Sequence, residues 1–189
     1  MIFKYDPEKE LDIFNRMAKD GKFGPEKTTQ LWAKEFGQVK FEDNCAFLGN
    51  QIGLCEENWK EVEANFLSKL SKFFEKDCDI PEDMTCYLVR YTTFPYSINY
   101  NWFNAPLFGN PSERNRVIMH ELIHFFTPEG LSRPLKEAVP VILNDHEGFN
   151  MYAADRGHQN DSEEMRLRPI IFDKYKTGET YTQILKSIV

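Results

Sequence analysis

Two histidines and a glutamate lie within five consecutive positions, in the segment Met119-His120-Glu121-Leu122-Ile123-His124-Phe125. Side chains four positions apart in a helix project from the same face, so His120 and His124 can bind one metal ion together. Glu121 lies about 100° further round the helix, beside the open position of the metal and not on the metal itself. There it can accept a proton from a metal-bound water, which is the task of the general base in a hydrolase.

The flanking residues predict the helix that this arrangement needs. Asn110 can cap it, Pro111 fits its first turn, and Glu113 has the spacing of a capping box. Pro128 ends the helix after Thr127. Because apolar residues almost surround the motif, we expect the helix to be deeply buried. These residues are Val117, Ile118, Leu122, Ile123, Phe125 and Phe126. A buried polar group without a partner costs roughly several kcal/mol, and a divalent cation would satisfy both histidines and the glutamate.

A catalytic zinc ion takes three protein ligands and keeps one position for water. Glu137 is the favoured third ligand, because a second helix can begin shortly before it and fold back onto the histidines. Ser132 or Arg133 would cap that helix, and Pro134 would open it. His146, in a polar segment after this helix, is the alternative third ligand.

The chain resembles small zincin metallopeptidases of the gluzincin type, in which H-E-x-x-H precedes a helix that bears a glutamate ligand. The resemblance covers about residues 84 to 144, and its specific element is the H-E-x-x-H segment. It implies that His120, His124 and Glu137 bind Zn²⁺ and that Glu121 is the general base.

The second helix departs from the gluzincin pattern. Such helices often read Glu-Gly-x-Ala, whereas this chain reads Glu137-Ala138-Val139-Pro140. Pro140 lacks a backbone N–H, so it should kink or end the helix. The spacing from His124 to Glu137 is also short for the larger gluzincins. The glycine and third histidine that follow the motif in metzincins are missing, which disfavours that branch.

The remaining pattern predicts a single α+β domain over residues 1–189 that is zincin-like, with a twisted mixed sheet packed on the active-site helix. The N-terminal part, about residues 1–80, is expected to be helical, and residues 84–144 hold the sheet, the active-site helix and the ligand-bearing helix. Residues 38–55 are rich in turns, and residues 170–189 suggest a strand followed by a helix. Two N-terminal helices are expected to begin at Pro7 and Pro25, and a third is expected to run from about Glu56 to Lys76.

Two strands are expected before the active-site helix, Thr85–Thr93 and Ser97–Asn104. By the resemblance, Ser97–Asn104 would be the edge strand, which offers backbone groups to an extended peptide. The alternative for this stretch is an ordinary core strand with exposed aromatic side chains.

Composition excludes several classes of protein. The net charge of −7 argues against a general nucleic-acid binder. An apolar run long enough for a signal peptide or a membrane span is missing. Four cysteines without a C-x-x-C pair indicate reduced, partly buried thiols. We therefore expect a cytoplasmic protein that acts on a peptide or protein substrate, with no nucleic-acid or membrane partner.

The predicted function is zinc-dependent hydrolysis of peptide bonds, with Glu121 as the general base. The alternative is a catalytically inactive or regulatory zincin-like module that binds protein, and a lesser one is a metal-dependent amidase that acts on other substrates. A peptidase also needs a hydrogen-bond donor for the oxyanion. Tyr152, His146 and His158 are the candidates for that role.

Overall fold

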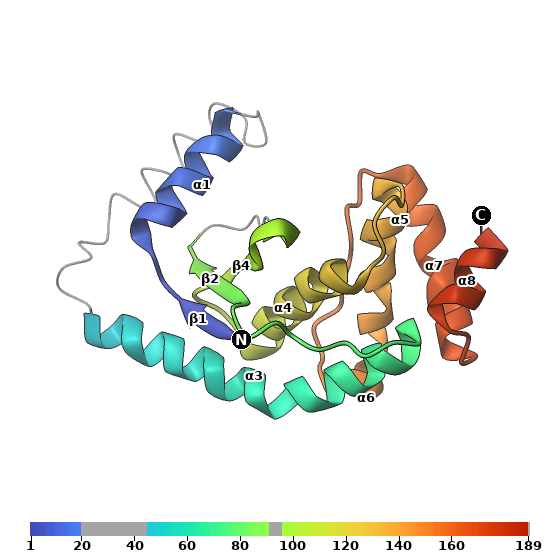
Figure 1. Cartoon of the computed structure of the whole chain (residues 1–189), viewed down its shortest axis with the longest axis horizontal. Coiled ribbons are helices and arrows are strands. Elements are labelled where there is room, and N and C mark those ends of the chain that lie inside the picture. The colour runs from blue at the N-terminus through green and yellow to red at the C-terminus, as the bar shows by residue number, and fades with distance from the viewer. Residues whose placement is uncertain (20–44, 91–95, 189) are drawn as a thin grey trace. The chain divides into compact units, whose positions relative to one another are not determined.

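The computed structural model describes residues 1–19, 45–90 and 96–188 of the chain (Figure 1). It combines helices with a small mixed sheet, which confirms the α+β class. The chain divides into two compact units. The first comprises Met1–Glu57 and Glu82–Gly109, and the second comprises Asn58–Pro81 and Asn110–Val189. The single zincin-like domain stays a prediction, and the helix expected from Pro25 lies outside the described residues.

The sheet lies in the first unit and has the strand order β1-β2-β4-β3. β1 and β4 both pair with β2 in parallel, whereas β3 pairs with β4 antiparallel. Phe3, Cys86 and Phe103 lie opposite one another across the three parallel strands and are buried. The strands are β1 (Ile2–Lys4), β2 (Thr85–Val89), β3 (Tyr96–Ser97) and β4 (Trp102–Pro106).

The expected strand Ser97–Asn104 is interrupted. A 3-10 turn, η3 (Ile98–Tyr100), is followed by Asn101 in the left-handed conformation with φ of 48°, which asparagine tolerates better than most residues. The Asn101 side chain also donates to Asp83 at 2.9 Å. The strand therefore resumes only at Trp102, and β4 lies between β2 and β3. The prediction that Ser97–Asn104 forms one edge strand is wrong, because only Ser97 belongs to the edge strand β3 and β4 lies inside the sheet.

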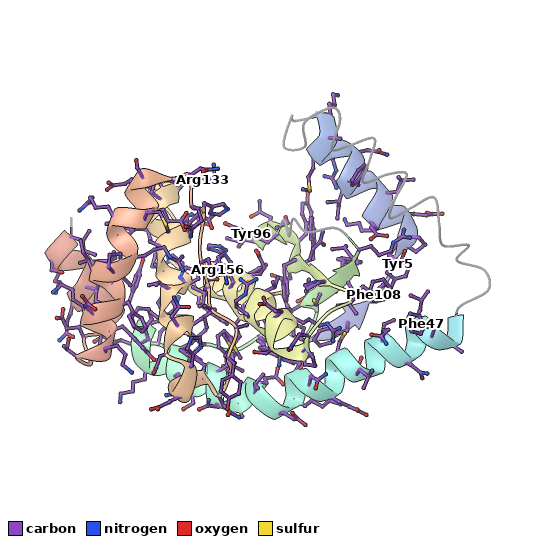
Figure 2. All side chains as sticks on the ribbon, turned by 180° about the vertical axis from the view of Figure 1, so that it is seen from behind. Tyr5, Phe47, Tyr96, Phe108, Arg133 and Arg156 are labelled. Atoms are coloured by element: carbon purple, nitrogen blue, oxygen red, sulfur yellow. The ribbon has the colours of Figure 1, made fainter. Side chains whose placement is uncertain are left out.

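Helix α1 (Pro7–Lys19) begins where the Asp6-Pro7 pair predicts it. The buried Glu10 carboxylate joins this helix to the residue that follows β2. Glu10 accepts hydrogen bonds from the backbone N–H of Arg90 at 2.6 Å and from its Nε and Nη2 at 3.0 and 2.9 Å. The Tyr5 hydroxyl donates to the same carboxylate at 2.9 Å, and Figure 2 labels Tyr5 in this unit.

Helix α3 (Cys45–Phe74) is longer than the sequence predicts. The turn-rich interpretation of residues 38–55 is wrong for 45–55, where the helical conformation persists despite Gly49 and Gly53. Across the part of the helix that belongs to the second unit, the apolar stripe is buried as expected. Its buried members there are Trp59, Val62, Phe66, Leu70, Phe73 and Phe74.

The second unit contains the helices that surround the predicted motif. They are α4 (Pro111–Phe126), α5 (Arg133–Ala138), the 3-10 helix η4 (Val139–Asn144), α6 (His146–Phe149), α7 (Ser162–Lys176) and α8 (Tyr181–Ile188). α7 packs on α5 and on η4, and Figure 1 shows α7 and α5 side by side. The strand expected after residue 170 is wrong, because that region continues α7 and then forms α8.

Two expectations from composition can be compared with the structure. Within residues 1–19, 45–90 and 96–188, no helix has the length and apolar character that crossing a bilayer requires. Cys55, Cys78 and Cys86 are buried, as expected.

Candidate metal centre

Helix α4 carries both motif histidines and the glutamate between them. Its N-terminus is capped as predicted, because the Asn110 side chain accepts a hydrogen bond from the backbone N–H of Ser112 at 2.8 Å. The helix ends before Thr127. The side chains of His120 and His124 are 13% and 2% exposed, so only the first reaches solvent appreciably.

Helix α5 places Glu137 against the two histidines. Ser132 precedes its first turn and Pro134 lies in it, as predicted. The α-helix gives way to η4 just before Pro140, which confirms that this proline ends it. Glu137 Oε2 consequently lies 3.6 Å from His120 Nε2 and 3.4 Å from His124 Nε2.

The donor set fits a tetrahedral zinc ion. Ligand bonds of about 2.0–2.1 Å in a tetrahedron place neighbouring ligand atoms about 3.3–3.4 Å apart. The distances from Glu137 Oε2 to His124 and His120, 3.4 and 3.6 Å, are at and slightly above this spacing, and one ligand atom from each of the three residues lies within 4.8 Å of the others. Two imidazoles with one carboxylate are also a ligand set that zinc accepts in catalytic sites.

The charges of these three side chains depend on one another. Burial opposes the ionisation of Glu137, but its contacts with His120 and His124 hold the pKa of this carboxyl well below its usual range. Burial lowers the pKa of His124, which keeps its imidazole neutral as a metal ligand must be.

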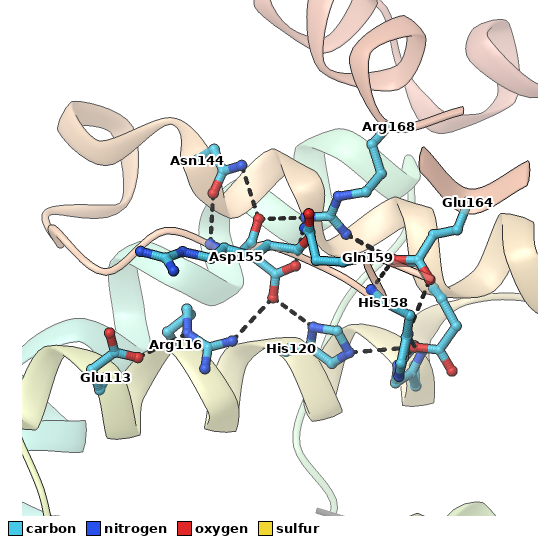
Figure 3. A network of polar contacts seen from close by, with 12 residues as sticks. Glu113, Arg116, His120, Asn144, Asp155, His158, Gln159, Glu164 and Arg168 are labelled. Atoms are coloured by element: carbon cyan, nitrogen blue, oxygen red, sulfur yellow. Dashed lines mark hydrogen bonds and ion pairs between the residues drawn. The ribbon is translucent and has the colours of Figure 1, made fainter. Parts of the chain in front are cut away.

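Asp155 orients the first histidine. Its Oδ2 lies 2.7 Å from His120 Nδ1 (Figure 3). Burial alone would raise the pKa of Asp155, but His120 and Arg168 hold it well below its usual range, so the group is ionised and can only accept. His120 Nδ1 therefore carries the proton, and Nε2 faces Glu137. Burial lowers the pKa of His120, but Asp155 and Glu137 outweigh it and raise the pKa to about 10.

Asp155 is itself held from several sides. Its Oδ1 accepts from Arg168 Nη2 at 2.6 Å, and its Oδ2 accepts from Arg116 Nη1 at 3.3 Å. The side chain of Asn144 pairs with the Asp155 backbone, accepting from its N–H at 2.7 Å and donating to its carbonyl at 3.1 Å. The carboxylate is 1% exposed, so the acceptor of His120 is fixed in position.

The Glu121 carboxyl is buried. Within the described part of the chain, Glu121 Oε2 has no hydrogen-bond partner. Burial is the main reason that the pKa of this carboxyl is raised to about 8, with His120 lowering it and Glu137 and Asp155 raising it.

His158 lies at the exposed rim of the cluster. Its side chain is 52% exposed, and its Nδ1 lies 3.0 Å from Glu164 Oε2 and 3.8 Å from Glu137 Oε2. The Glu164 side chain is fully buried and also accepts the backbone N–H of His158 at 2.9 Å. Gly157, at φ of +60°, brings the backbone so close that a Cβ there would lie 2.6 Å from Arg168 Nη1.

The other two predicted site residues, His146 and Tyr152, make their contacts outside this cluster. His146 lies in α6, and its Nδ1 is 3.0 Å from the Met151 carbonyl. Among the described histidines, cysteines and acidic residues, His146 does not join the group able to share a metal. The Tyr152 side chain is 87% exposed, and its backbone N–H donates to Ser112 Oγ at 3.1 Å. Of the predicted residues, the structure thus brings His120, His124 and Glu137 together.

Sequence reasoning missed the supporting residues Asp155, Glu164 and Arg168. A local signal existed for two of them, because Asp161 caps α7 and the Glu164–Arg168 spacing of four is that of an ion pair on one helical face. Asp155, in an irregular polar segment, had no such signal.

Comparison of the chain with family models, with curated proteins and with solved structures found no match.

Proposed function

We propose that the chain is a zinc-dependent hydrolase of peptide bonds. The observation that carries this proposal is the convergence of His120, His124 and Glu137, with Glu137 Oε2 3.6 and 3.4 Å from Nε2 of the two histidines. The supporting observation is the buried Glu121 carboxylate, which has an oxygen without a hydrogen-bond partner in the described residues. Zinc, when bound, supplies a water of lowered pKa and polarises the carbonyl to be cleaved.

In the proposed reaction, Glu121 moves the proton. Its carboxylate accepts a proton from the attacking water and returns it to the leaving amine. The pKa of about 8 that burial gives this carboxyl describes the protein without a cation, and a cation nearby lowers the pKa of a carboxyl. Glu121 would then be ionised at neutral pH, as a general base must be.

His158 is the favoured donor to the oxyanion among the three candidates. Glu164 accepts from its Nδ1, so Nε2 can donate to a substrate group when both ring nitrogens carry a proton, and the ring lies beside the Glu137 carboxylate. Tyr152 is 87% exposed, and His146 Nδ1 lies 3.0 Å from the Met151 carbonyl, outside the group of His120, His124 and Glu137. A His158→Ala variant is expected to lower kcat with little change in bound zinc, because it removes a donor that acts on the transition state.

Zinc content and turnover of four variants test the proposal. His120→Ala and Glu137→Gln should lose zinc, whereas Glu121→Gln should keep zinc and lose cleavage of a peptide library. His146→Ala is the matched control and should keep both, because His146 contacts a backbone carbonyl outside the cluster. A wild-type protein that stays metal-free in zinc-replete buffer would overturn the proposal. Bound zinc without any turnover would favour the regulatory, protein-binding alternative instead.

A further inference from the structure

Arg168 makes contacts that join three segments of the second unit. Its guanidinium is 5% exposed and lies on α7. Nη1 donates to the Glu137 backbone carbonyl at 3.2 Å and to Glu164 Oε1 at 3.3 Å. Nη2 donates to Asp155 Oδ1 at 2.6 Å and also to the Asp155 carbonyl. Figure 3 shows this guanidinium between Asp155 and Glu164.

Each of these contacts leads to a side chain of the candidate metal centre. The Glu137 carbonyl belongs to the residue that supplies the carboxylate ligand. Asp155 holds Nδ1 of His120 at 2.7 Å, and Glu164 holds Nδ1 of His158 at 3.0 Å. The buried Arg168 guanidinium therefore contacts the backbone of the ligand Glu137. It also contacts the two carboxylates that hold His120 and His158.

Few side chains could make this set of contacts. A guanidinium is planar and carries five N–H donors in a fixed fork, whereas a lysine ammonium is a compact point charge. The carboxylates of Asp155 and Glu164 are 1% and 0% exposed, so both depend on donors from the protein. A lysine at position 168 could approach one of these partners but could not span them all.

We propose that Arg168 is a positioning residue of the metal centre. It sets the Glu137 backbone and the His120 ring at the separation that zinc requires before zinc binds. The inference rests on the proposed function, because it concerns the same centre, and it adds α7 to the elements that determine the affinity for metal. Residues that orient metal ligands from behind typically change affinity by about 10–100-fold when they are replaced.

The test compares Arg168→Lys with Arg166→Lys. Arg166 lies on the same helix and pairs with Glu163, but both side chains are more than half exposed, so its replacement is a matched control. Zinc affinity is measured by competition with a chromophoric chelator, at a temperature where near-UV circular dichroism shows each variant folded. We expect the Kd of Arg168→Lys to rise about 10–100-fold and that of Arg166→Lys to stay at the wild-type value. The visible absorption of the Co²⁺-loaded protein should change in Arg168→Lys alone.

A measurement on the wild-type protein covers the case in which Arg168→Lys does not fold. In arginine-labelled protein, the Nη–H signals of Arg168 should be separate and slow to exchange, and they should shift when zinc is added. Those of Arg166 should be averaged and should not shift. Equal zinc affinity in the two lysine variants, or averaged Arg168 signals that do not shift when zinc is added, would overturn this inference and leave the proposed function standing. A wild-type protein that binds no zinc would overturn the proposed function and the inference with it.

Discussion

Replacing Gly157 with alanine should destabilise the second unit far more than the same change at Gly178. Both glycines have positive φ, +60° and +88°, so alanine costs about 1–2 kcal/mol of backbone strain at either position. At Gly178, among the described residues, nothing lies within 4 Å of the added Cβ. At Gly157, the added Cβ would overlap Glu164 Oε1 and lie 2.6 Å from Arg168 Nη1.

The overlap at Gly157 cannot be relieved cheaply. Glu164 and Arg168 end in flexible groups, but both side chains are buried and bound to several partners, so a shift breaks hydrogen bonds to charged groups. Each such bond contributes about 1.5–3 kcal/mol. With the backbone strain and the loss of one such bond, the total for Gly157→Ala is about 2.5–5 kcal/mol. For a chain of this length that corresponds to a fall in Tm of about 10 °C.

Urea unfolding followed by far-UV circular dichroism measures the difference. The expected result is a midpoint for Gly157→Ala well below that of Gly178→Ala, with similar m-values for both, because neither change alters the surface exposed on unfolding. Equal midpoints for the two variants would refute the reasoning, since they would show that the carboxylate and guanidinium packed on Gly157 move without cost.

Three further predictions concern charged groups. Asp155→Asn should weaken zinc binding about 10–100-fold, as chelator competition on the folded protein would show. Glu10→Gln should lower the free energy of unfolding by about 3 kcal/mol, because it breaks a buried ion pair, whereas Asp12→Asn, in an exposed pair, should change it by less than about 1 kcal/mol in urea titrations. Burial opposes the ionisation of Asp145, but Lys176 lowers its pKa below the ordinary 3.8. Ionised Asp145 therefore stabilises the fold above pH 3.8, and this stabilisation is lost as the pH falls through the pKa of the folded state. The stability difference between wild type and Asp145→Asn should therefore be full at pH 7 and shrink below about pH 4, and a difference that grows on acidification would contradict this sign.

Local signals account for the elements that the sequence predicts well. The cap at Asn110, Pro111 in the first turn and the stop after Thr127 involve neighbours in the chain, so their effect does not depend on the rest of the fold. Pro140 also acts locally, because its missing N–H removes one hydrogen bond of the α-helix, although Pro169 does not end α7. The end of the first helix after Thr127 and the stop at Pro140 together predicted where Glu137 lies.

Contacts between distant residues explain what the sequence could not predict. β4 lies between β2 and β3 because it pairs with both. The hydrophobic periodicity of a single segment does not show which other strands it will pair with. α7 was partly mistaken for a strand, because its buried face includes the charged Glu164 and Arg168 along with Leu167 and Ile171. A buried ion pair interrupts the pattern of apolar residues from which a helix is predicted.

The position of the supporting residues has a consequence for how the protein folds. Arg168 is 13 positions from Asp155 and 31 from Glu137, and Asp155 is 35 from His120. The entropy lost in closing such loops rises only slowly with their length, and contacts between residues near in sequence form quickly. All of these residues belong to the second unit, whereas the sheet belongs to the first. The centre can therefore assemble from a continuous stretch of chain without waiting for the strands to pair.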